Sequence, residues 1–210
     1  MRAAILNLSV LAAGPALAEP VTLVAFGDSL TAGYGLPPYD GFVPQLQAWL
    51  DDHGAEVTVI NAGVSGDTTA GGLARIDWTL TPDVDAMILT LGGNDLLRGL
   101  PPEEARGNMD AILARIEGKG IPVLLVPMSA PGNYGPDYKT RFDAIYPELA
   151  VAHDAILTQP FLTPILSLPD RAKALADYVQ PDGLHPNRDG VALVVETLGP
   201  QVLTLLDRVE

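Results

Sequence analysis

Short apolar stretches alternate with longer amphipathic segments along most of this chain. The apolar stretches have the length of single strands, and the segments between them carry apolar residues at helical spacing. This alternation is typical of βαβ units, in which helices cover a parallel sheet. Strands are expected at residues 21–26, 56–63, 84–93, 121–128 and 154–160.

Helices are expected in the segments between these strands and after the last one. The first should end at Gly54, because glycine is common just past helix C-termini. The last should be kinked or broken at Gly199-Pro200, because proline lacks the N–H that a helix interior uses. The expected helices are 42–53, 68–80, 102–118, 136–153 and 187 to about the end. The pattern predicts an α/β fold, a three-layer α/β/α sandwich around a five-stranded parallel sheet.

Polar, glycine-bearing loops follow the first three expected strands. Their sequences are GDS at 27–29, NAGVSGDTTAGG at 61–72 and GGNDLLRG at 92–99. The carboxyl ends of parallel strands lie at one edge of a sheet, which is where ligands bind in open α/β folds. We therefore expect the three loops to converge on one site.

Ser29 is the candidate nucleophile of that site, and it needs a base to accept its proton. The chain has three histidines. His53 and His153 end expected helices, where a cation favourable to the helix dipole explains them. His185 lies instead in the turn-rich loop PDGLHPNRDG, which makes it the candidate base.

Asp182 precedes His185 by three residues and is the candidate partner of its ring. Gly183 between them allows a tight turn, so the carboxylate can reach Nδ1 of the imidazole. A serine, a histidine and an aspartate in contact form the usual triad of nucleophilic catalysis. Taken alone, the same residues are also explained by an ordinary turn followed by a helix cap.

Acyl transfer also needs hydrogen-bond donors for the oxyanion that forms on the substrate carbonyl. The candidates are the N–H of Ser29, the N–H of Gly66 and the side-chain amide of Asn94. Gly66 and Asn94 are equally common as turn or cap residues. Their expected position on the same sheet edge as Ser29 favours the catalytic interpretation.

Four blocks, FGDSLTAGYG, NAGVSGDTTAGGLARI, LGGNDLLRG and DGLHPNRDG, resemble in order and spacing those of the SGNH, or GDSL-type, serine hydrolases. The sequence is most similar to the bacterial group of periplasmic arylesterases, thioesterase I and lysophospholipases, and the likeness covers nearly all of the mature chain. It implies a flavodoxin-like sheet and neither metal nor cofactor. It also implies a triad of Ser29, Asp182 and His185, with Ser29, Gly66 and Asn94 as the oxyanion hole.

The same resemblance implies an apolar substrate site beside the triad. The loop after Asn94 and the segment SAPGNYGPDY would flank it. Ordinary packing is the alternative explanation for each of its apolar residues. The candidates are Leu96, Leu97 and Tyr134, together with Leu100 and Met128.

The first 18 residues have the three parts of a secretory signal peptide. Arg2 opens the segment, an apolar stretch follows, and ALA ends at Ala18. The expectation is a cleaved signal at 1–18, a single domain at 19–210, and a periplasmic or secreted protein with no permanent membrane anchor. A cytoplasmic protein with an apolar first helix is the alternative.

Composition restricts the partners and the chemistry of the chain. Twelve basic and 26 acidic residues give a formal charge of −14, which disfavours nucleic acid and anionic membranes. There is no cysteine, so disulfides and thiolate nucleophiles are excluded. We expect a monomer that acts on a small-molecule substrate.

These observations predict an exported serine esterase that cleaves aryl esters, acyl thioesters or lysophospholipids through an acyl-enzyme. A carbohydrate O-acetylesterase could use the same machinery. A non-catalytic protein could hold an anion with GVSGDTTAGG, although this loop lacks the GK[ST] ending of a nucleotide P-loop. A metal hydrolase built on His185 with Asp28 or Asp182 would need further ligands that have no obvious source.

Overall fold

The structure is a computed structural model that describes residues 20–209, so the expected signal peptide at 1–18 lies outside the described residues. Five parallel strands form one sheet in the order β2-β1-β3-β4-β5, as expected of a flavodoxin-like sheet. Each lies within or close to an apolar stretch, although the last three are shorter than predicted. The strands are β1 (Val21–Gly27), β2 (Val57–Gly63), β3 (Ala86–Thr90), β4 (Val123–Leu125) and β5 (Ile156–Leu157).

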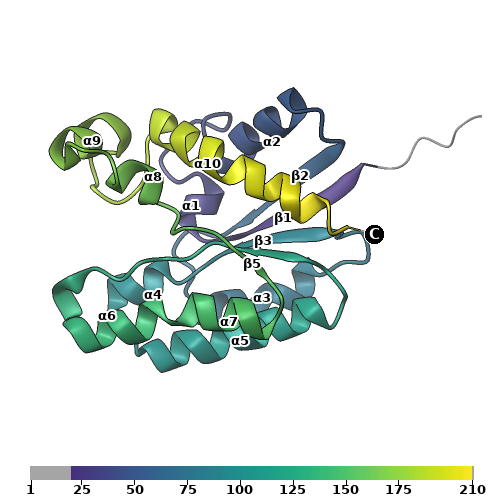
Figure 1. Ribbon diagram of the computed structural model, residues 1–210, viewed down its shortest axis with the longest axis horizontal. Coiled ribbons are helices and arrows are strands. Elements are labelled where there is room, and N and C mark those ends of the chain that lie inside the picture. Colours follow the sequence, from purple (N-terminus) through teal and green to yellow (C-terminus); the bar gives the residue numbers. More distant parts are fainter. Residues whose placement is uncertain (1–19, 210) are drawn as a thin grey trace, which may run out of the picture.

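Helices cover both faces of the sheet, and the predicted three-layer sandwich is confirmed (Figure 1). One layer holds α2 (Phe42–Asp52) and α10 (Arg188–Leu206). Because both faces are covered, every residue of the central strand β3 is buried. The other layer holds α3 (Thr69–Thr79), α5 (Pro102–Glu117), α6 (Pro136–Asp143) and α7 (Ile145–Ala152).

Short helices that the sequence pattern did not predict gather beyond the carboxyl ends of the strands (Figure 1). With three to eight residues each, they are too short for a periodic apolar pattern to stand out. They form the walls of the crevice at this edge. They are α1 (Ser29–Ala32), α4 (Gly93–Arg98), the 3₁₀ turn η1 (Gly132–Tyr134), α8 (Thr163–Leu166) and α9 (Arg171–Tyr178).

Two proline-containing helices differ from their predictions in opposite ways. The helix expected at 136–153 is divided at Ala144 into α6 and α7. Pro147 has no N–H to donate to the carbonyl four residues earlier, which favours an interruption there. The break expected at Pro200 is wrong, because α10 continues to Leu206. Pro200 and Glu196 both lie on the exposed face of α10, where water can bind the carbonyl that the proline leaves free.

Among residues 20–209, α10 is the one helix that is long enough and apolar enough to cross a membrane. Its apolar face is occupied within the protein, since Val194, Leu198 and Val202 are buried in the core. This is the ordinary arrangement of a core helix in a three-layer fold.

The crevice of this fold opens where β1 and β3 lie side by side. The chain leaves β1 toward one helical layer and leaves β3 toward the other, so the loops after these two strands separate. Gly27 ends β1 in a position that admits no side chain: a Cβ there would lie 2.1 Å from Thr31 Oγ1 and 2.6 Å from the carbonyl oxygen of Thr90. The absence of a side chain lets α1 begin directly against β3.

Candidate active site

Ser29 is the first residue of α1, immediately beyond the end of β1. Asp28 caps this short helix, because its Oδ1 accepts a hydrogen bond from the N–H of Leu30 at 3.0 Å. The strand, the cap and the helix together hold the partly exposed Ser29 at the carboxyl edge of the sheet. The N–H of Ser29 lies in the first turn of α1, where helix geometry leaves N–H groups without intrahelical partners.

The imidazole of His185 connects Ser29 to Asp182. Its Nε2 lies 2.8 Å from Ser29 Oγ, and its Nδ1 lies 2.7 Å from Asp182 Oδ2. An ionised carboxylate only accepts hydrogen bonds, so Nδ1 carries the proton and donates it to Asp182. In the neutral ring Nε2 then accepts the hydroxyl hydrogen of Ser29, as a general base requires.

The loop that carries Asp182 and His185 is closed by its own hydrogen bonds. Asp182 Oδ1 accepts from the N–H of Leu184 at 2.9 Å and from the N–H of His185 at 3.1 Å. Gly183 has φ +72°, the left-handed conformation that this tight turn needs. Partial burial by itself raises the pKa of Asp182, but the hydrogen bonds from Leu184 and His185 outweigh it and lower this pKa to about 2.

Gln180 joins this loop to the segment that carries Ser29, a role the sequence analysis missed. Its side-chain amide donates to the carbonyl oxygen of Tyr34 at 2.8 Å and to that of Pro186 at 3.0 Å. Its backbone N–H donates to the carbonyl oxygen of His185 at 2.8 Å. Tyr34 also contacts the His185 ring, with centroids 4.7 Å apart. A glutamine two residues before the candidate aspartate was the only sequence signal.

Asn94 lies in the first turn of α4, beyond the end of β3, and lines the same pocket as Ser29. Its Nδ2 donates to the carbonyl oxygen of Asp67 at 2.8 Å and lies 3.4 Å from Asp28 Oδ2. One amide hydrogen therefore holds the loop after β2. The other donates to Asp28 Oδ2 over this longer distance.

Asp28 is a carboxyl group buried beneath this pocket, with an exposed fraction of 1%. Burial raises its pKa to about 6, against the lowering effect of the Leu30 N–H and of His185. The carboxylates of Asp67 and Asp95 raise the pKa further. Asp28 thus titrates close to neutral pH inside the site.

Gly66 is placed differently from the other oxyanion candidates. It is exposed, has φ +87° and is not among the residues that line the pocket. Its carbonyl oxygen accepts a hydrogen bond from Arg98 at 2.8 Å. The donation of its N–H to an oxyanion therefore stays a prediction.

A pocket of about 460 Å³, here called the Ser29 pocket, opens beside Ser29 and His185. Of the apolar candidates, Leu96, Leu97, Met128 and Tyr134 line it, but Leu100 does not. Leu100 instead accepts a hydrogen bond from Tyr138 on its carbonyl oxygen at 2.8 Å. The sequence analysis missed the opposite wall, where α8, α9 and the following residue contribute Ile165, Leu166, Leu175 and Val179.

The two remaining histidines lie at helix ends, as expected. His53 follows α2 and stacks on Trp49, with ring centroids 3.6 Å apart. His153 follows α7 and binds Asp110 at 2.9 Å and Glu117 at 2.8 Å. Within residues 20–209, no group of three or more His, Cys, Asp or Glu side chains is arranged to hold a metal ion.

A serine, histidine and aspartate hydrogen-bonded in line, beside a pocket at the edge of a parallel sheet, define a site of the serine hydrolase class. Comparison with known proteins agrees with this class. The model of the GDSL-like lipase/acylhydrolase family matches residues 25–193. The chain belongs to this family, whose members are serine hydrolases that act on esters.

Individual relatives share most of their length with this chain. The arylesterase of Vibrio mimicus is 35% identical over 184 residues, which cover 86% of this chain and 88% of that protein. The structure of AlinE4, an SGNH-hydrolase family esterase, is 43% identical with a TM-score of 0.68 and covers 91% of this chain and 99% of that one. The psychrotrophic esterase EstA from Pseudoalteromonas sp., solved in a form inhibited by monoethylphosphonate, is 29% identical with a TM-score of 0.80 and covers 89% of this chain and 98% of that one. These likenesses extend over most of the chain.

Proposed function

We propose that this protein hydrolyses carboxylic esters or thioesters through an acyl-enzyme formed on Ser29. The observation that carries the proposal is the hydrogen-bonded line from Ser29 Oγ through the His185 ring to Asp182, at 2.8 and 2.7 Å. Such a line is the arrangement that activates a serine hydroxyl. The family to which the chain belongs supports the same reaction.

The proposed reaction has two stages. Ser29 Oγ attacks the carbonyl carbon of the ester while His185 Nε2 takes the hydroxyl proton, and a tetrahedral oxyanion forms. His185 then gives the proton to the leaving alcohol or thiol, and the acyl group stays on Ser29. A water molecule, deprotonated by His185, then attacks the acyl carbonyl carbon. The bond to Ser29 Oγ breaks, the carboxylic acid leaves, and His185 returns the proton to Oγ. Asp182 holds the ring in the required tautomer and stabilises the imidazolium between these proton transfers.

Asn94 Nδ2 and the N–H of Ser29 are the proposed donors to the oxyanion, with the N–H of Gly66 as a third. Donors that are already in place when the charge develops stabilise the transition state at no cost of reorganisation. Asn94 is held by Asp67 and lines the pocket with Ser29, which supports its role. The reaction proposed here uses no group beyond these side chains, backbone N–H groups and water.

The Ser29 pocket supports a substrate with an apolar portion. Leucine side chains of α4 line one wall. Leucine, isoleucine and valine side chains of α8, of α9 and of the residue after α9 line the opposite wall. Aryl esters, acyl thioesters and lysophospholipids all have such a portion. A series of 4-nitrophenyl esters from acetate to decanoate, with acetylated xylan as the carbohydrate alternative, measures the preference directly.

Covalent labelling with a fluorophosphonate tests the proposed function. The wild type should gain the mass of one phosphonyl group, and Ser29→Ala should gain none. Ser129→Ala is the matched control, because Ser129 lines the same pocket but its hydroxyl is bound by Lys139 and the His185 ring by Ser29 and Asp182, so its loss should leave labelling intact. A folded wild type that is not labelled, and that hydrolyses none of the esters, rejects the proposal.

We also propose that the protein is exported and acts as a monomer. The support for export is the n-region, apolar stretch and ALA site within residues 1–18. N-terminal sequencing of the protein from the periplasm of an expressing cell should find a mature chain that begins near Glu19. Sedimentation of this chain should give the mass of one copy.

A further inference from the structure

The Ser29 pocket contains one arginine or lysine among the residues that line it, Arg171. Arg171 is the first residue of α9 and is exposed. The neighbouring wall of the pocket is apolar and includes Leu166 and Leu175. A permanent positive charge therefore lines a pocket whose surface is otherwise mostly apolar.

Within residues 20–209, no hydrogen bond or ion pair from the side chain of Arg171 to another residue is found. Carboxylates are plentiful in the chain, which has 26 acidic and 12 basic residues. Lys173, on the same helix, pairs with Asp177 at 2.5 Å. Asp170, beside Arg171 in sequence, uses Oδ1 to cap α9 through the N–H of Lys173.

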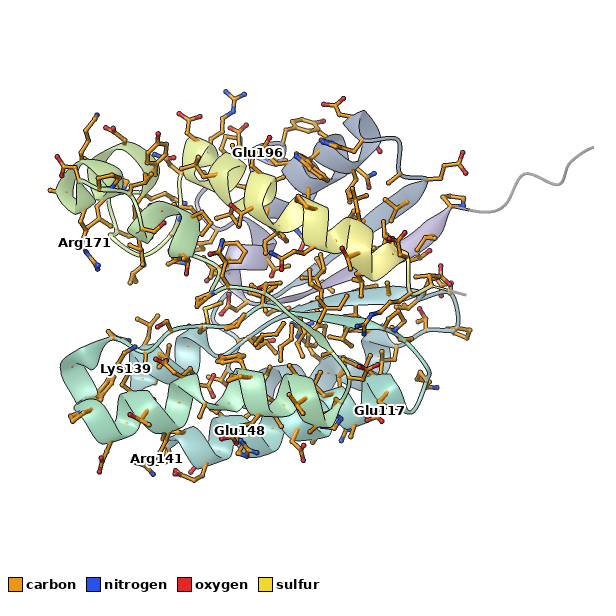
Figure 2. The ribbon with its side chains drawn as sticks, in the orientation of Figure 1. Glu117, Lys139, Arg141, Glu148, Arg171 and Glu196 are labelled. Atoms are coloured by element: carbon orange, nitrogen blue, oxygen red, sulfur yellow. The ribbon has the colours of Figure 1, made fainter. Side chains whose placement is uncertain are left out.

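The facing layer offers a contrast to Arg171. Figure 2 shows Arg171 below α9 and Lys139 on α6 of the opposite layer. The Lys139 ammonium is occupied by Asp143 Oδ2 at 2.6 Å and by the carbonyl oxygen of Ala130 at 2.8 Å. Of these two cations, Arg171 is the one that lines the Ser29 pocket and has its donors available.

A guanidinium presents several N–H donors in a planar fork that matches carboxylate and phosphate oxygens. Apolar walls strengthen such a contact, because they exclude part of the water that would screen it. The formal charge of −14 repels anionic substrates at long range, so a local cation is needed for the pocket to accept one.

We propose that Arg171 forms an anion subsite of the Ser29 pocket, which binds a carboxylate or phosphate group carried by the ester substrate. This proposal rests on the proposed function, since it assumes that the substrate carbonyl lies at Ser29. The anion belongs either to the far end of the acyl chain or to the alcohol or thiol that leaves. In both cases the substrate is amphiphilic, with an apolar portion along the leucine side chains and a negative charge at Arg171.

Paired substrates distinguish the two sources of the anion. For the acyl side, 4-nitrophenyl monoesters of adipic and suberic acids are compared with 4-nitrophenyl hexanoate and octanoate. For the leaving-group side, 4-acetoxyphenyl phosphate is compared with phenyl acetate. The measured quantity is the ratio of kcat/KM for the anionic ester to kcat/KM for its neutral partner, so differences in intrinsic reactivity cancel between variants.

Arg171→Gln should lower this ratio by about three- to tenfold in one of the two arms, while Arg171→Lys keeps most of it. The ratio is the readout, rather than either kcat/KM alone, because Arg171 lines the substrate pocket. Lys173→Gln is the matched control: it removes the same charge from the same helix at a residue that does not line the pocket, and should leave the ratio unchanged.

A ratio that is unchanged in both arms, or that falls equally in Lys173→Gln, overturns the anion subsite. In that case the neutral esters are still hydrolysed, so the proposed function survives. If the wild type hydrolyses no ester of either arm, the proposed function fails instead. Calorimetric titration with octyl phosphate tests the subsite without hydrolysis: Arg171→Gln should bind it about three- to tenfold more weakly than the wild type, and equal binding rejects the subsite.

Discussion

His185 Nε2 lies 2.8 Å from Ser29 Oγ, although 156 positions of sequence separate the two residues. The contact depends on two short local structures, the helix α1 that begins at Ser29 and the turn that closes at His185. Gln180 bridges the two by binding Tyr34 on one side and Pro186 on the other. The hydrogen bonds of Gln180 therefore help to hold Ser29 and His185 at this distance.

Asp182→Asn should lower kcat by about 10³- to 10⁴-fold while the fold is retained. An asparagine can turn its NH₂ group toward Nδ1 and so favour the tautomer in which Nε2 is protonated and cannot act as a base. Steady-state hydrolysis of phenyl acetate measures the effect, with circular dichroism as the check of folding. Asp189→Asn removes an acidic residue in the first turn of α10 and should keep near wild-type kcat.

The pKa of Asp182 also predicts how pH acts on this residue. Its folded pKa of about 2 lies below its ordinary value of 3.8, so its ionised form favours the folded state above pH 3.8 and this contribution is lost as pH falls through 2. Between pH 5 and 8 the carboxylate is ionised in both states. The difference in unfolding free energy between the wild type and Asp182→Asn should therefore be constant in that window, which urea unfolding at several pH values checks.

Asn94→Ala should reduce kcat by about 10²- to 10³-fold, the usual effect of removing one oxyanion donor. KM should change much less, because the donor acts mainly on the charge that develops in the transition state. Asn133→Ala is the matched control, since Asn133 lines the same pocket from η1. Asn133→Ala should keep near wild-type kcat. If Asn94→Ala does so as well, Asn94 is not an oxyanion donor.

Gln180→Leu should lower kcat by about 10- to 100-fold, because small displacements of a catalytic base have effects of this size. It removes the donor of the hydrogen bonds to Tyr34 and Pro186, so the free energy of unfolding should also fall by about 1–3 kcal/mol. Gln201→Leu makes the same change on α10, away from the Ser29 pocket, and is the control. A variant that is less stable but has unchanged kcat when folded would show that Gln180 does not position His185.

Asp28→Asn should change the pH dependence of stability. The folded pKa of about 6 lies above the ordinary 3.8, so the folded state binds more protons than the unfolded state between these values. Stability therefore falls as pH rises through this window, by about 3 kcal/mol in total for a shift of this size. Asparagine keeps the cap on Leu30 but does not titrate.

The measurement is urea unfolding of the wild type and of Asp28→Asn at pH 4 and at pH 8. The difference in unfolding free energy should move in favour of the variant by about 2 kcal/mol between the two values, because the unfolded carboxyl is already partly ionised at pH 4. A difference that is independent of pH contradicts the raised pKa of Asp28. Comparing the two proteins at each pH cancels the contributions of the other acidic groups.

Much of the fold follows from local pattern. Each predicted strand exists, because a buried strand of a parallel sheet needs a continuous apolar run that is visible in one dimension. The candidate nucleophile, base and aspartate were also identified from the sequence, since Gly-Asp-Ser after a strand and Asp-Gly-Leu-His before a helix combine reactive groups with turn residues. The helix 136–153 and the break at Pro200 were predicted incorrectly because their outcome depended on packing and exposure, which vary from one proline to another.

The amino-acid order was sufficient for the layers of the fold and for the choice of the three candidate triad residues, because both depend on residue type and on neighbours close in the chain. Only the folded arrangement decided which surfaces meet. It placed α8 and α9 opposite Leu96 and Leu97, left Leu100 outside the pocket and brought Arg171 to its lining without a carboxylate partner. Contacts of this kind join segments far apart in the chain, and their energies depend on distances that no local pattern contains.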